Sequence, residues 1–119
     1  NDSTSTAAVL ASVELPDSSG VLVAALVRRL SEATDWTDRR NTASALIARA
    51  ERGDKEAKSA AKSLFRSPEP EIRRAMVAGC GHRELFAGEV ERARTKDPSP
   101  EVRAEAERVE SRRIKSSSR

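Results

Sequence analysis

The chain reads Pro68-Glu69-Pro70-Glu71-Ile72-Arg73 and, 30 residues later, Pro98-Ser99-Pro100-Glu101-Val102-Arg103. Four of the six positions are identical, and a fifth exchanges isoleucine for valine. Each copy has the composition of a helix start. Proline in a first turn loses no helical hydrogen bond, and glutamate there favours the positive end of the helix dipole. The repeat therefore predicts two equivalent helices, one starting near Pro70 and one near Pro100.

The sequence around this repeat divides into segments with apolar residues at intervals of three and four, each bounded by turn residues. They predict helices over residues 21–33, 35–52, 55–66, 70–79 and 82–96, and a last helix from about residue 100 to 110. No segment alternates with period two, so we expect no strands. Two helices per period of about 30 residues are typical of a helical solenoid. The predicted fold is all-α, an α-α superhelix of about six helices in stacked antiparallel pairs.

The repeated residues resemble the HEAT-like (armadillo-type) repeat family, in its short bacterial form of about 30 residues. The matching positions are Glu71-Ile72-Arg73 with Ala75, and Asp97-Pro98-Ser99-Pro100-Glu101-Val102-Arg103 with Ala106. A weaker third copy, Thr37-Asp38-Arg39-Arg40 with Ala43 and Leu46, lacks the prolines. The resemblance covers about residues 35–110, and it implies a stacked-helix scaffold for interactions.

Composition divides the chain into three parts. Residues 1–19, rich in Ser, Thr and Ala, predict a linker or a weak N-terminal helix over residues 7–13. Residues 20–110 form the expected HEAT-like repeat domain, and residues 111–119 the expected disordered basic tail. The tail contributes +4 to a formal net charge of +3, so residues 1–110 carry −1. The positive net charge therefore belongs to the tail and does not by itself indicate nucleic-acid binding by the domain.

Membrane and secreted classes are disfavoured. Cys80 is the single cysteine, so no intrachain disulfide forms, and we expect a cytoplasmic location. The longest apolar run, Val21 to Val27, is far shorter than the roughly 20 residues that cross a bilayer. We therefore expect no membrane association.

Cys80-Gly81-His82 is the stretch closest to a chemical site, because it brings a thiol and an imidazole together. A structural zinc site needs about four ligands, however, and the chain has one cysteine and one histidine. The sequence also lacks a glycine-rich phosphate loop and a Ser-His-Asp set. We expect no catalytic, metal or cofactor site and no small-molecule substrate, with Cys80 buried at a helix-to-helix corner.

Two features are candidates for contacting a partner. Trp36, expected in the connection between the first two helices, is either an interaction anchor or a cap on the core. Lys55, Lys58, Lys62 and Arg66 share one face of a predicted helix, which the resemblance to HEAT-like repeats would place on the concave side. They form either a phosphate-binding stripe or a solvated face. The helix over residues 82–96 mixes acids and bases, so the stripe does not continue.

These observations predict a non-catalytic scaffold for protein–protein interaction, a segment of a longer solenoid, whose partner is a protein. The alternative is nucleic-acid backbone binding through the basic stripe and the tail. A third interpretation is a segment of an enzyme that contains HEAT-like repeats.

Overall fold

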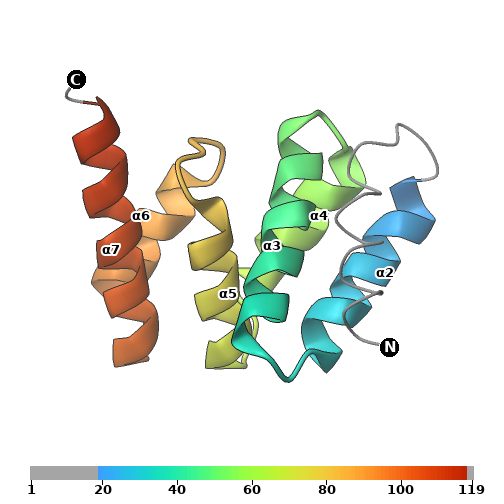
Figure 1. The fold of residues 1–119 in the computed structure, drawn as a ribbon, viewed down its shortest axis with the longest axis horizontal. Coiled ribbons are helices and arrows are strands. Elements are labelled where there is room, and N and C mark those ends of the chain that lie inside the picture. The colour runs from blue at the N-terminus through green and yellow to red at the C-terminus, as the bar shows by residue number, and fades with distance from the viewer. Residues whose placement is uncertain (1–18, 118–119) are drawn as a thin grey trace.

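The computed structural model describes residues 19–117, which form six helices (Figure 1). They are α2 (Ser19–Glu32), α3 (Trp36–Glu51), α4 (Lys55–Leu64), α5 (Pro70–Cys80), α6 (Ala87–Lys96) and α7 (Pro100–Ser117). No strand occurs between residues 19 and 117, so the predicted all-α class is confirmed. Within the same range, no helix is long and apolar enough to span a bilayer.

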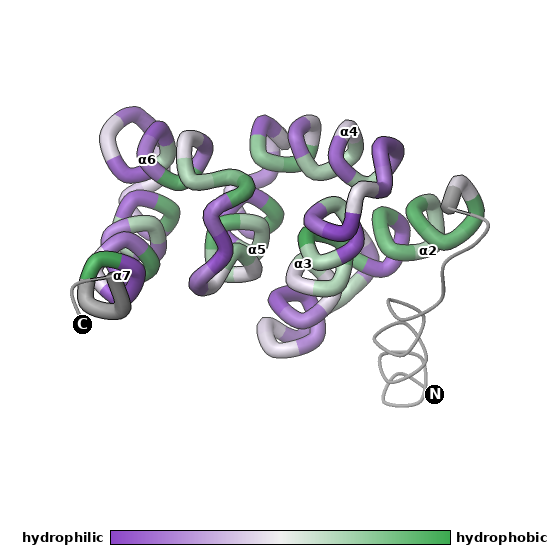
Figure 2. Tube along the Cα trace, turned by 90° about the horizontal axis from the view of Figure 1, so that it is seen from above, coloured by the Kyte–Doolittle hydropathy of each residue, from purple (hydrophilic) through white to green (hydrophobic). Residues whose placement is uncertain are grey.

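The helices lie in two layers. In the view from above, α3, α5 and α7 lie side by side, and α2, α4 and α6 form the second layer (Figure 2). α3 packs against α2 and α4, α5 contacts both α3 and α7, and α6 packs against α7. The layer of α3, α5 and α7 therefore brings together the two helices of the sequence repeat and the helix of its weaker third copy.

Caps and prolines determine where these helices begin. The carboxylates of Asp35 and Asp54 each accept a hydrogen bond of 3.0 Å from the backbone N–H three residues later, at the starts of α3 and α4. Pro70 and Pro100 are the first residues of α5 and α7, as the repeat predicts. Gly53 follows α3 with φ of 100°, a left-handed conformation that favours glycine.

The fourth residue of α3, α5 and α7 is an arginine that donates to the backbone carbonyl six residues earlier. The pairs are Arg39 with Ala33, Arg73 with Ser67 (2.8 Å) and Arg103 with Asp97 (2.7 Å). Arg73 also forms a two-point ion pair with the Asp97 carboxylate, at 2.9 and 3.0 Å. Each arginine thus fastens its helix to the connection that precedes it. The third copy shares this contact although its prolines are missing.

The core is aliphatic and rich in alanine, with side chains from all six helices. Its largest fully buried members include Leu26, Leu30, Leu46, Ile47, Met76 and Val102. α3 and α5 lie very close together at Gly79. A Cβ placed there would lie 2.8 Å from the Ser44 backbone nitrogen and 3.0 Å from the Ala43 Cβ. The contact between these two helices therefore depends on small residues.

The helix predicted over residues 82–96 begins later, at Ala87. Gly81 ends α5 with φ of 54°, and residues 82–86 form a turn before α6. The sequence pattern counts Leu85 and Phe86 as one inward face. In the structure Phe86 is buried against Phe65, with ring centres 5.2 Å apart, whereas Leu85 is exposed. Residues 82–86 therefore form a turn that buries the Phe86 ring, and they do not form the first turn of the helix that the periodicity predicts.

α7 also differs from the prediction, because it continues to Ser117 rather than ending near residue 110. The expected disordered tail is therefore helical over residues 111–117. Arg113 pairs with Glu110 at 2.8 Å and with Glu84 at 3.1 Å, and both hydrogen bonds raise its pKa. The expected linker over residues 1–19 lies outside the described residues except for Ser19, which begins α2, as do residues 118–119 of the expected tail.

Candidate functional site

A groove of about 720 Å³ crosses the layer formed by α3, α5 and α7. We call it the arginine groove. Its lining residues are Trp36 and Arg40 from α3, Arg74 and Ala78 from α5, Gly81 and His82 after α5, and Glu105, Arg108 and Arg112 from α7. Four arginines face one glutamate, so the groove is strongly positive.

Trp36 lies at one side of this groove. It is the first residue of α3, directly after the capping residue Asp35, so it lies at the start of the helix predicted over residues 35–52 and borders the connection from α2. The ring is half-buried and packs against the core. The Arg74 guanidinium lies over its face, 4.0 Å from the ring centre, which is a cation–π contact. Trp36 therefore both packs against the core and lines the groove.

Glu105 holds two of the arginines in place. The residue is only 5% exposed, and a single oxygen of its side chain, Oε1, accepts from Arg74 Nε at 3.1 Å and from Arg108 Nη2 at 2.7 Å. Burial acts to raise the pKa of Glu105. The hydrogen bonds from Arg108 and Arg74 outweigh burial, and the pKa lies below its usual range. The carboxylate is therefore charged at neutral pH and fixes both guanidinium groups.

One chain of contacts thus links Trp36, Arg74, Glu105 and Arg108 across α3, α5 and α7. Arg74 uses only Nε within the described residues, which leaves both of its Nη groups for a ligand. The Arg40 side chain is exposed and makes no hydrogen bond or ion pair to a described residue. Guanidinium groups bind carboxylates and phosphates with two parallel hydrogen bonds. The groove is therefore suited to an anionic ligand.

The lysines of the predicted stripe lie in the other layer. Lys55, Lys58 and Lys62 are exposed on α4, on the face opposite the buried Ala57 and Ala61, as the helical periodicity predicts. α4 lies in the other layer from α3 and α5 (Figure 2), and none of its residues lines the arginine groove. The three lysines line neither the arginine groove nor the second cavity described next.

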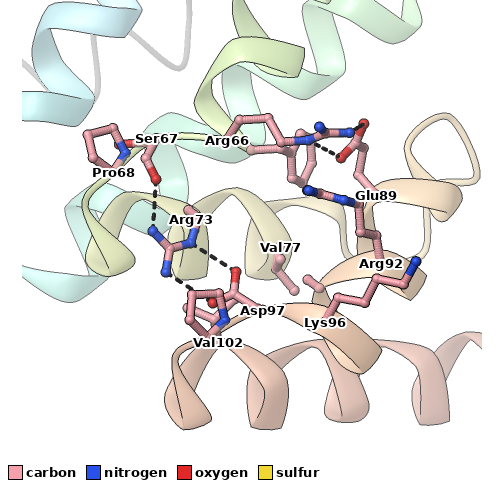
Figure 3. A pocket seen from close by; sticks show the side chains of 13 residues that line it. Arg66, Ser67, Pro68, Arg73, Val77, Glu89, Arg92, Lys96, Asp97 and Val102 are labelled. Atoms are coloured by element: carbon pink, nitrogen blue, oxygen red, sulfur yellow. Dashed lines mark hydrogen bonds and ion pairs between the residues drawn. The ribbon is translucent and has the colours of Figure 1, made fainter.

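Arg66, the fourth member of the stripe, follows the end of α4 and lines a second cavity of about 440 Å³ (Figure 3). Its guanidinium binds both carboxylate oxygens of Glu89 at 3.2 Å. The Arg73–Asp97 ion pair forms another part of the wall. Burial acts to raise the pKa of Asp97, but the hydrogen bonds from Arg73 and from the Ser99 N–H outweigh burial, and the pKa lies below its usual range. The structure thus separates Arg66 from the three lysines.

Cys80 and His82 have different surroundings. Cys80 is fully buried at the end of α5, and burial raises the pKa of its thiol to about 12. A thiol with this pKa is protonated and unreactive at neutral pH. His82 lines the arginine groove instead. Within residues 19–117, no group of three or more His, Cys, Asp or Glu side chains is placed to hold a metal ion.

The groove residues on α5 and α7 were not singled out by the sequence. One signal is present: the pair Arg39-Arg40 recurs as Arg73-Arg74 at the same position of α5. The first arginine of each pair binds the preceding connection and the second lines the groove. Nothing in the sequence marks Glu105, because its burial depends on how α5 and α7 pack together.

Comparison of the chain with models of protein families, with curated proteins and with solved structures gave no significant match. The resemblance to HEAT-like repeats therefore rests on the sequence motif, and the structure supports it at the level of an all-helical protein of six described helices.

Proposed function

We propose that this chain is a non-catalytic scaffold of HEAT-like repeats that binds a protein partner in the arginine groove. The observation that carries this proposal is the groove itself. Three successive helices of one layer build it jointly, and the contacts from Trp36 through Arg74 to Glu105 hold it in one shape. A surface that spans several repeats is the typical binding surface of helical-repeat proteins.

The solenoid part of the proposal has its own support. α3, α5 and α7 begin with the same arginine contact, and they lie side by side while α2, α4 and α6 cover one side of them. In a solenoid each helical pair buries its apolar face against its neighbours only, which gives this two-layered order. The repeated contact is therefore the local interaction that we expect to be copied from one repeat to the next.

The composition of the groove favours a protein ligand. Tryptophan and arginine are enriched among the residues that dominate binding energy at protein interfaces. Trp36 and Arg74 supply both types at one point, and both are only partly exposed. Side chains that are already ordered lose little conformational entropy when a partner binds.

Site-specific photo-crosslinking tests the proposal. A photoreactive amino acid is placed at Ala78 in the groove, at Arg112 on its edge, or at Lys58 on α4 as the control. We expect cross-links to polypeptide from the two groove positions and fewer from Lys58. Equal yields at all three positions, or adducts that nuclease removes, would contradict a protein-binding groove.

Nucleic-acid backbone binding is the second candidate. Lys55, Lys58 and Lys62 favour it, because they are exposed and form no ion pair with a described residue. Phosphate contacts of this kind weaken by orders of magnitude between about 50 and 200 mM salt. Duplex DNA that binds the wild type at low salt and no longer binds the variant Lys58→Glu/Lys62→Glu would support this function. No binding at low salt would exclude it.

A further inference from the structure

We infer that the segment entering the arginine groove is an extended acidic polypeptide, with aspartate or glutamate at alternate positions. This inference rests on the proposed function and specifies the chemistry of its partner. Three properties of the groove carry it: its charge, the fixed orientation of its arginines and its length.

The charge of the groove calls for several carboxylates. Arg40, Arg74, Arg108 and Arg112 line it, and Glu105 neutralises one of them. Three positive charges remain in the lining of a groove whose volume is about 720 Å³. The four arginines come from three helices, α3, α5 and α7, so the surplus charge is spread across the groove rather than gathered at a single anion site.

Two of the arginines are held ready for a ligand. Arg74 Nε and Arg108 Nη2 lie at most about 6 Å apart, because both bind the same oxygen of Glu105. Trp36 supports the Arg74 guanidinium from one side at 4.0 Å. The remaining donors of both arginines are still available within the described structure. A carboxylate of the partner therefore meets donors whose orientation is already set, which lowers the entropic cost of binding.

The length of the groove sets the spacing of the partner's acids. Packed helices lie about 8–10 Å apart, so a ligand that crosses from α3 over α5 to α7 spans roughly 16–20 Å. An extended chain advances about 3.3 Å per residue, and its side chains alternate between two sides. Five or six residues then cover the groove, with three side chains facing it. Three carboxylates at alternate positions match the three uncompensated arginine charges.

The groove fits nucleic acid less well than it fits an acidic polypeptide. Bases of a single strand stack on open aromatic faces, but one face of Trp36 is covered by Arg74, and the only other ring among the lining residues is the small imidazole of His82. A duplex gains affinity from a broad basic surface, whereas Lys55, Lys58 and Lys62 lie on α4 in the other layer. The lysines therefore do not extend the positive surface of the groove.

The test uses the full chain and its own fluorescence, because Trp36 is the only tryptophan. The probe is a fluorescein-labelled peptide of about seven residues with glutamate at alternate positions and serine or glycine between them. Three reference ligands are compared with it: a peptide of equal composition with the three glutamates adjacent, a lysine peptide, and a short duplex oligonucleotide. We expect the alternating peptide to bind most tightly, to shift Trp36 emission, and to weaken as salt rises.

A matched pair of variants locates the binding site. Arg40→Ala/Arg112→Ala removes two exposed arginines from the groove, and Lys58→Ala/Lys62→Ala removes the same charge from α4. Charge-assisted hydrogen bonds make each lost contact costly, so we expect the arginine variant to bind the alternating peptide about 10- to 100-fold more weakly. The lysine variant should bind it within about twofold of wild type, since the charges that it removes are screened and distant.

Each other result would overturn the inference. Equal losses in the two variants would show non-specific attraction, equal affinity for the two acidic peptides would refute the extended register, and tighter binding of the oligonucleotide would favour nucleic acid. Failure of every peptide, together with protein cross-links at Ala78, would overturn the acidic partner and leave the proposed scaffold function intact. Absence of both would refute the two proposals together.

Discussion

Replacing Gly79 with alanine should destabilise the protein, because it places a methyl group between α3 and α5. The new Cβ would lie 2.8 Å from the Ser44 backbone nitrogen, 3.0 Å from the Ala43 carbonyl carbon and 3.0 Å from the Ala43 Cβ. None of these atoms belongs to a flexible side chain that could move aside. The two helices must therefore separate by a few tenths of an ångström along their contact.

Two opposing effects set the size of the change. Overpacking of a close contact costs about 1–3 kcal/mol. Alanine is favoured over glycine inside a helix by about 1 kcal/mol, and Gly79 lies within α5, so part of the cost is offset. The expected net loss in the free energy of unfolding is about 1–2 kcal/mol. For a domain of this size each kcal/mol lowers Tm by roughly 4–8 °C.

Gly88→Ala is the matched control, because a Cβ at Gly88 meets no atom within 4 Å. That substitution keeps the gain in helix propensity without the steric cost, and we expect stability equal to or slightly above wild type. Urea unfolding followed by circular dichroism measures both variants. If Gly79→Ala is as stable as Gly88→Ala, the close approach of α3 and α5 is not present in solution.

Three further predictions follow from buried or paired groups. Glu105→Gln should lower stability at pH 7 by about 1 kcal/mol, a modest figure because Arg108 is half-exposed and its contact is screened. Since the pKa of Glu105 is lower in the folded than in the unfolded protein, its contribution is complete above the ordinary pKa and is lost as the pH falls through the folded value. The difference from wild type in urea unfolding should therefore shrink as the pH falls below the ordinary pKa of a glutamate, and a constant difference would contradict it. Cys80 should react with a maleimide far more slowly in the native protein than in urea, because burial raises its thiol pKa to about 12, and equal rates would show that the thiol is accessible. Arg113→Ala should speed amide hydrogen exchange in the last turns of α7, whereas Arg112→Ala should not, because only Arg113 bridges to Glu84.

Helix positions were predictable from the sequence where local chemistry determines them. The prolines at the repeat and the acidic cap Asp54 lie at helix starts in the structure. The helical face of Lys55, Lys58 and Lys62 was also correct, because a residue interval of three or four places side chains on one side of any helix.

Features that depend on tertiary packing were not predictable. The start of α6 moved because Phe86 is buried against Phe65, a contact that the local periodicity does not contain. The helical end of α7 depends on the Arg113–Glu84 ion pair, whose members are 29 residues apart. Separation of Arg66 from the lysines likewise follows from its pairing with Glu89 on α6.

Consecutive arginines explain how one repeat supports both the fold and the groove. Neighbouring helical residues point about 100° apart, so when Arg73 binds the preceding connection, Arg74 faces the groove. α7 departs from this rule, because Ala104 follows Arg103 and the groove arginine appears one turn later, at Arg108. The fourth residue of the helix, which binds the preceding connection, is thus arginine in all three helices, whereas the fifth residue is arginine in α3 and α5 and alanine in α7.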